Sequence, residues 1–102
     1  MKTHLETKAL FAGYNPADNH GAVKPPMHPA STFVFPSAAV GAAHMETAYG
    51  VEGAETPPEG GFIYSRLGNP TLSVAESRLS AWDESDAAAV FASGMAAIST
   101  ML

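Results

Sequence analysis

Two short stretches of the 102-residue chain carry residue types suited to binding an anion, and the first is the segment 62–71. Within it, Tyr64, Ser65 and Arg66 place a phenol, a hydroxyl and a guanidinium at consecutive positions. If the segment is extended, Tyr64 and Arg66 lie on one face, because side chains alternate along a strand. The planar guanidinium fits a phosphate or a carboxylate, and the phenol adds a donor. The segment predicts half of an anion clamp; the alternative is a surface Arg beside a packed Tyr.

The second stretch lies near the C-terminus. An unbroken apolar run of strand length covers residues 87–92, and Ser93, Gly94 and Met95 follow it into a helix-like sequence. A strand that turns through a small residue and Gly into a helix offers backbone N–H groups to an anion. Together the two stretches give the chain two features suited to a phosphate.

A helix is expected between the two stretches. Asn69 is a good N-cap and Pro70 suits the first helical position, because Pro has no N–H to leave unpaired. Apolar residues recur on one face of this helix, and its last aromatic, Trp82, is expected to anchor a core. A helix followed by the apolar strand 87–92 and a further helix indicates an α/β domain with a parallel sheet.

The first helix is expected to start at a capping box and to stop at a glycine. Thr3 is the expected N-cap, with Glu6 reaching back to it, and Gly13 is the expected stop. Residues 14–29 are rich in Pro, Gly, Asn and Asp, and so cannot build a core of their own. This segment is expected to be disordered or to form an arm laid over another surface. In an oligomer, that surface would belong to a neighbouring subunit.

Three further elements are expected before the clamp segment. Residues 31–35 have strand propensity, with Phe33 and Phe35 on one side. Ser37 is expected to cap a helix over 38–49. The Gly- and Pro-rich residues 50–61 predict a mobile surface loop, either a plain solvated insertion or an edge of the active-site entrance.

Composition excludes several classes of function. The formal net charge is −5 and the five Lys and Arg residues are scattered, so no nucleic-acid binding is expected. There is no Cys, and no two of the four His residues have zinc-ligand spacing, so no metal site is expected. The longest uncharged stretch is too short for a membrane span, which needs about 20 residues. The expected location is the cytoplasm, and no membrane partner is expected.

The chain resembles the cystathionine γ-synthase / methionine γ-lyase family of pyridoxal-phosphate (PLP) enzymes. The residues that carry the resemblance are the segments 64–71 and 92–98, supported by 21–26 and 31–35. The resemblance implies fold type I, the aspartate aminotransferase-like α/β fold of PLP-dependent transferases. Residues 1–61 would be the N-terminal arm with its helices and loop. Residues 62–102 would be the clamp and the first strand–helix unit of the PLP-binding domain, in a chain that reads as a fragment.

The resemblance also implies where the cofactor binds. Backbone N–H groups at the second stretch would hold the PLP phosphate, while the clamp would reach the phosphate in a neighbouring subunit. Active sites would then be shared across subunits in a homotetramer, a dimer of dimers. The cofactor-binding residues implied in this way are Tyr64, Ser65, Arg66, Ser93, Gly94 and Met95.

No catalytic residue is assigned within the chain. Its three lysines, Lys2, Lys8 and Lys24, all precede the α/β segment, whereas the Schiff-base lysine of the family follows a strand of that domain. The chain alone is therefore expected to be inactive. The implied activity is making or breaking C–S bonds of a sulfur amino acid or an activated homoserine, as in trans-sulfuration. The alternative is a non-catalytic oligomerisation or anion-binding module that retains the arm and the clamp.

Overall fold

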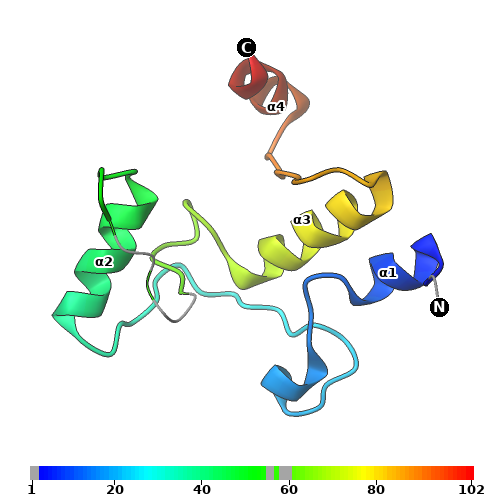
Figure 1. Ribbon diagram of the computed structural model, residues 1–102, viewed down its shortest axis with the longest axis horizontal. Helices are drawn as coiled ribbons and strands as arrows, with labels where there is room; N and C mark the ends of the chain where they lie inside the picture. The colour runs from blue at the N-terminus through cyan, green and yellow to red at the C-terminus, as the bar shows by residue number, and fades with distance from the viewer. Residues whose placement is uncertain (1–2, 55–56, 58–60) are drawn as a thin grey trace. The chain divides into compact units, whose positions relative to one another are not determined.

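Helices dominate the computed structural model, which describes residues 3–54, 57 and 61–102 (Figure 1). The elements run α1 (Leu5–Phe11), the 3₁₀ helix η1 (Pro16–Asn19), α2 (Ala38–Ala48), α3 (Pro70–Asp83) and α4 (Gly94–Met101). The chain forms two units: Met1–Met27 with Thr71–Leu102, and His28–Pro70. Each unit is described by itself. The boundary expected after residue 61 stays a prediction.

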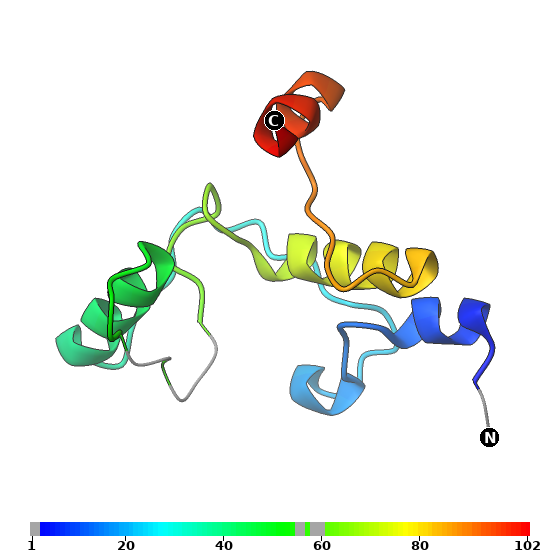
Figure 2. The same ribbon diagram turned by 45° about the horizontal axis from the view of Figure 1, so that its top comes forward.

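In the first unit, α1 and α3 lie side by side in both views (Figures 1 and 2). Nη2 of Arg78 on α3 donates a hydrogen bond to the Leu10 carbonyl oxygen at 2.9 Å. Gly13 lies just after the end of α1, with φ +68°, and packs against Ser77 of α3. A Cβ built on Gly13 would lie 2.6 Å from the Ser77 Oγ. Gly13 therefore stops α1, as predicted, and also lets the chain pass close to α3.

The capping box expected at Thr3 is wrong. The N-cap of α1 is His4, which makes no side-chain capping bond, and the first helical turn is closed by Lys8 N donating to the His4 carbonyl at 3.0 Å. Because the helix starts one residue later, Glu6 falls at the second helical position, where it cannot complete the box.

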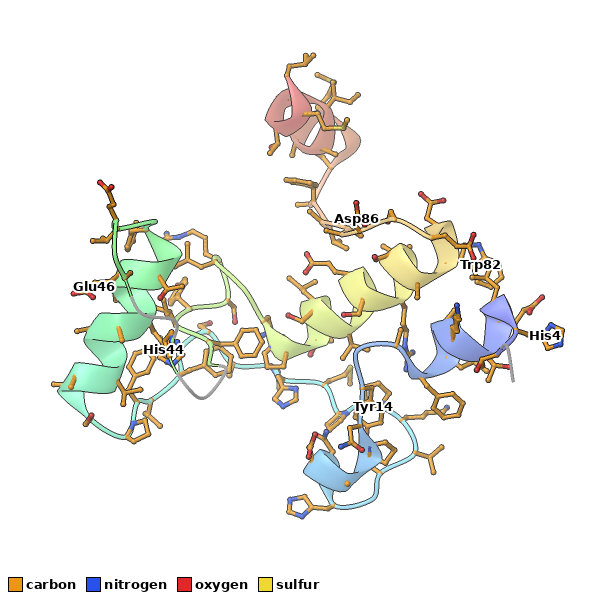
Figure 3. The ribbon with its side chains drawn as sticks, viewed as in Figure 1. His4, Tyr14, His44, Glu46, Trp82 and Asp86 are labelled. Atoms are coloured by element: carbon orange, nitrogen blue, oxygen red, sulfur yellow. The ribbon has the colours of Figure 1, made fainter. Side chains whose placement is uncertain are left out.

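The turn-rich segment after α1 folds locally on itself. Asn15 caps η1 by accepting a hydrogen bond from Ala17 N at 3.2 Å. The Tyr14 hydroxyl, labelled in Figure 3, lies 2.5 Å from the Ala22 carbonyl oxygen. Further along, Val23 and Met27 are 86% and 83% exposed. Contact of this arm with a neighbouring subunit stays a prediction.

The strand expected at residues 87–92 is absent, since the segment has no regular secondary structure. A strand is stable only when a neighbour completes its ladder, and no described segment pairs with it. Instead Val90 N donates to Oε1 of Glu76 on α3 at 3.1 Å. The described part of the chain thus contains no sheet, although the sequence led us to expect an α/β domain.

Trp82 is 55% exposed at the C-terminal end of α3 (Figure 3), so the prediction that it anchors a core is wrong for this chain. Leu72 and Leu79, on the face expected to be apolar, are 40% and 53% exposed. The apolar face of α3 was identified by its spacing, but nothing among the described residues covers it. No apolar side chain of the described residues is buried.

In the second unit, α2 confirms the helix predicted after Ser37, whose Oγ accepts from Val40 N at 3.3 Å. Phe35 stacks on His44 of α2, with ring centroids 5.3 Å apart. Gly41 allows this approach, because a Cβ there would lie 3.0 Å from the Phe35 ring. The packing of α2 therefore depends on the aromatic segment before it.

The strand expected at residues 31–35 is reduced to one antiparallel bridge, between Thr32 and Tyr64. Pro36 follows the segment at once, and Pro has no N–H to extend a ladder. Phe33 packs against Phe62, with centroids 5.6 Å apart, while Val34 between the two phenylalanines is 97% exposed. The expected alternation holds although the strand does not form.

Only part of the loop expected over residues 50–61 is described. Gly50 and Gly53 have φ of +64° and +80°, which L side chains rarely adopt, so this part turns at its glycines. Residues 55–56 and 58–60 of the predicted mobile loop lie outside the described residues.

Candidate functional site

The clamp segment forms a turn with Tyr64 at its start. The Tyr64 carbonyl oxygen accepts from Leu67 N at 2.9 Å and from Gly68 N at 3.1 Å. The guanidinium carbon of Arg66 lies 5.1 Å from the centroid of the Tyr64 ring. Tyr64 and Arg66 are thus on the same side of the segment, although the segment is a turn and not the extended arm that the sequence predicts.

Ser65, between these two residues, makes its contacts within the chain. Its backbone N donates to the Ser31 carbonyl at 2.9 Å, and its hydroxyl donates to the Ala30 carbonyl. Because a hydroxyl has a single proton, Ser65 has none left for a phosphate in this conformation. The expectation that it binds the cofactor stays a prediction.

The second half of the candidate site is the start of α4. Ser93 is its N-cap, with φ −152° and ψ 156°, and the Ser93 Oγ accepts from Ala96 N at 3.1 Å. The N–H groups of Gly94 and Met95 belong to the first turn, where no intrahelical acceptor exists. Nothing lies within 4 Å of a Cβ built on Gly94, so the approach to these donors is open.

The structure brings Tyr64, Ser65 and Arg66 together in one unit, and Ser93, Gly94 and Met95 together in the other. Each half offers donors that suit an anion: a guanidinium with a phenol in the first, and helix N-terminal amides in the second. A phosphate dianion in a partly desolvated pocket needs several such donors. Each donor set, taken by itself, is of a type that suits a phosphate.

Other chemistry finds little support in the described residues. Residues 3–54, 57 and 61–102 contain no group of three or more His, Cys, Asp or Glu side chains able to hold a metal ion. No helix in that part of the chain is long and apolar enough to cross a membrane. Lys8 lies in α1 and Lys24 in the turn-rich segment, so neither follows a strand.

Two contacts near the site could not be recognised from the sequence. Oε1 of Glu76 on α3 accepts a hydrogen bond from the backbone N of Val90, three residues before Ser93. Asn69 was expected only to cap α3, yet its side-chain nitrogen donates to the His28 carbonyl at 3.1 Å. The partners of both side chains lie far along the chain, so local sequence patterns give no signal for them.

Comparison with known proteins assigns the chain to a class of PLP enzymes. The family model described as Cys/Met metabolism PLP-dependent enzyme matches residues 6–102. The chain therefore belongs to this family, whose members depend on PLP.

Curated relatives carry the names of two activities. The chain is 40% identical over 94 residues to an L-methionine gamma-lyase of Pseudomonas deceptionensis, covering 92% of this chain and 21% of the relative. It is 38% identical over 96 residues to the same enzyme of Pseudomonas putida, covering 94% and 22%. It is 40% identical over 91 residues to a cystathionine gamma-synthase of Mycobacterium bovis, covering 89% and 19%. The chain thus spans about a fifth of the length of these relatives.

Proposed function

We propose that the chain is the N-terminal part of a PLP-dependent enzyme that makes or breaks C–S bonds of sulfur amino acids. The substrate would be a sulfur amino acid such as methionine or cystathionine, or an activated homoserine. The family assignment supports this proposal, and both relatives' names describe such chemistry. The alternative, a non-catalytic binding module, has no relative among these to support it.

The observation that carries the proposal is the pairing of Arg66 with Tyr64 on one side of a hydrogen-bonded turn. A guanidinium stacked on a phenol keeps its planar fork of donors in one orientation, so less side-chain freedom is lost when an anion binds. Arg66 would then contact the phosphate through charge-assisted hydrogen bonds, with the Tyr64 hydroxyl as a further donor.

The start of α4 would hold a phosphate by a different device. Ser93 directs its Oγ to Ala96 N, which fixes the first turn and leaves the N–H groups of Gly94 and Met95 to an anion. The open space beside Gly94 allows the ligand to approach the backbone.

The family resemblance implies that the two sets of donors serve two active sites. In this proposal Tyr64 and Arg66 of one subunit contact the phosphate bound at the α4 N-terminus of a neighbour. The working unit would be at least a dimer, and we propose a cytoplasmic homotetramer arranged as a dimer of dimers. The parent domain would have the type I α/β fold, with 1–61 as arm and 62–102 entering the PLP-binding domain.

When bound, PLP supplies an electron sink for bonds at the substrate amino acid. The residues of this chain bind and orient the phosphate, and none is assigned a proton-transfer step. The lysine that holds the cofactor covalently is not among Lys2, Lys8 and Lys24. The chain by itself would therefore show no turnover.

The proposal is tested by purifying the full-length protein that carries this chain and adding PLP. We expect saturable binding, followed by thiol release from L-methionine or L-cystathionine, or by cystathionine formation from an activated homoserine and cysteine. Controls omit PLP. Saturable PLP binding without any of these reactions would contradict the proposed activity, and absence of PLP binding would contradict the site as well.

A further inference from the structure

Asn69 is 7% exposed, and no other described residue is classed as buried. Its Nδ2 lies 3.1 Å from the His28 carbonyl oxygen, 3.0 Å from the Ser65 Oγ and, as a longer contact, 3.5 Å from the Ala30 carbonyl oxygen. A buried amide is costly unless it is hydrogen-bonded, and this NH₂ group has two protons for these acceptors. The Asn69 side chain thus joins residues about 40 positions apart in the sequence.

Ser65 completes the connection. Its hydroxyl accepts from Asn69 and donates to the Ala30 carbonyl, while its backbone N donates to the Ser31 carbonyl. The side chains of Ser65 and Asn69 and the carbonyls of His28 and Ala30 therefore form one network, which we call the 28–69 latch. All of its members belong to the same unit, His28–Pro70.

Tyr64 and Arg66 precede and follow Ser65, so the chain itself connects both residues to the latch. Tyr64 is bridged to Thr32, and Arg66 lies over the Tyr64 ring on their shared side. A residue whose side chain and backbone N are both fixed leaves the residues beside it little freedom to rotate. Ser65 thus restrains the backbone from which the phenol and the guanidinium project.

We propose that Asn69 and Ser65 are positioning residues, which hold segment 28–32 against the clamp so that Tyr64 and Arg66 present their donors together. The part of this inference that concerns the cofactor rests on the proposed function. The latch itself does not, because all of its hydrogen bonds join residues of this chain. Ser65 then acts through its neighbours rather than by touching the phosphate.

The test uses the full-length protein free of cofactor and measures amide hydrogen exchange at Ser65, Leu67 and Gly68. Asn69→Ser removes the NH₂ donor yet keeps a neutral side-chain oxygen able to cap α3. We expect these amides to exchange about three- to tenfold faster in Asn69→Ser, the loss expected for one or two net hydrogen bonds. Ser65→Ala, which empties the centre of the latch, is expected to do the same and serves if Asn69→Ser does not fold.

Asn19→Ala is the matched control, because the Asn19 Nδ2 also donates to a carbonyl, that of Asn15, but in the other unit. It should leave exchange at residues 65–68 unchanged. Unchanged exchange in both latch variants would overturn the inference, as would an equal acceleration in Asn19→Ala.

A second measurement links the latch to the clamp through PLP affinity. Asn69→Ser is expected to weaken PLP binding about three- to tenfold in the wild-type background, but less than about twofold when Arg66→Ala is also present. Equal losses in both backgrounds would overturn positioning through Arg66. If Arg66→Ala alone leaves PLP affinity unchanged, the proposed clamp fails, whereas the exchange rates still decide whether the latch exists.

Discussion

The Arg66 guanidinium carbon lies 5.1 Å from the centroid of the Tyr64 ring, and the two side chains project from one turn of the chain. This cation–π contact joins the two groups that the sequence predicts to act together on an anion. Arg66 lies outside the helices and is not buried. Loss of its side chain should therefore affect binding more than folding.

Replacement of Arg66 by Ala is expected to weaken PLP binding in the full-length protein without lowering its melting temperature. The lost charge-assisted hydrogen bonds contribute about 1.5–3 kcal/mol, which corresponds to about a ten- to hundredfold loss of affinity. Arg66→Lys should recover only part of the loss, because an ammonium lacks the bidentate fork. Equilibrium titration with PLP and thermal melting measure the two effects, and unfolding of Arg66→Ala would show that the residue has a structural role instead.

Glu76 is expected to position the approach to the α4 N-terminus through its hydrogen bond to Val90 N. Glu76→Ala should weaken PLP binding about three- to tenfold, whereas Glu76→Gln keeps an acceptor oxygen and should recover most of the affinity. Glu46→Ala removes the same charge from an exposed position on α2 (Figure 3) and is the control. A loss of equal size in Glu46→Ala would show that net charge, rather than the contact with Val90, governs the effect.

Gly13 and Gly21 form a natural pair for testing the contact between α1 and α3. Both have positive φ, +68° and +79°, but only Gly13 lies against another side chain, that of Ser77. Ala should strain the backbone at both positions, while at Gly13 it also overlaps Ser77. We expect Gly13→Ala to lower the free energy of unfolding by about 1–3 kcal/mol more than Gly21→Ala does. Equal losses in denaturant titrations of the full-length protein would rule out the steric contact.

Residues 1–102 expressed alone are expected to lack a cooperative fold and to be inactive. None of the described apolar side chains is buried, and Trp82, Ile98 and Met101 are 55%, 53% and 88% exposed. Without apolar burial, nothing offsets the conformational entropy lost on folding. Thermal melting followed by circular dichroism tests this, and a sharp two-state transition at low protein concentration would contradict it.

Local signals in the sequence were enough to place several helices. Ser37 caps the start of α2, Pro70 is the first residue of α3, and Gly13 follows the C-cap of α1. Such caps and breakers act within one turn of the chain. The strands predicted at 31–35 and 87–92 do not form in the structure. A strand depends on a neighbouring strand, which its own residues do not specify. Propensity alone therefore overstated the extended structure.

In the candidate site, too, some features could be predicted from the sequence and others could not. The shared side of Tyr64 and Arg66 was predicted from the alternation of side chains along an extended segment, but in the structure it comes from a hydrogen-bonded turn that starts at Tyr64. The buried role of Asn69 could not be predicted, because it depends on carbonyl groups of His28 and Ala30, and any residue type supplies a carbonyl. Only folding brings these groups together.

Arg66 of one subunit is proposed to contact the phosphate in the PLP site of its neighbour. This contact is tested by co-expressing Arg66→Ala chains with chains in which the cofactor-binding lysine is replaced. At a PLP concentration too low to saturate Arg66→Ala, each variant alone should be nearly inactive, but a hybrid contains one site that combines an intact lysine with an intact Arg66 from the neighbour. We predict that purified hybrids regain C–S bond activity well above either parent. Hybrids that demonstrably form yet show no more activity than either parent would contradict the cross-subunit role of Arg66.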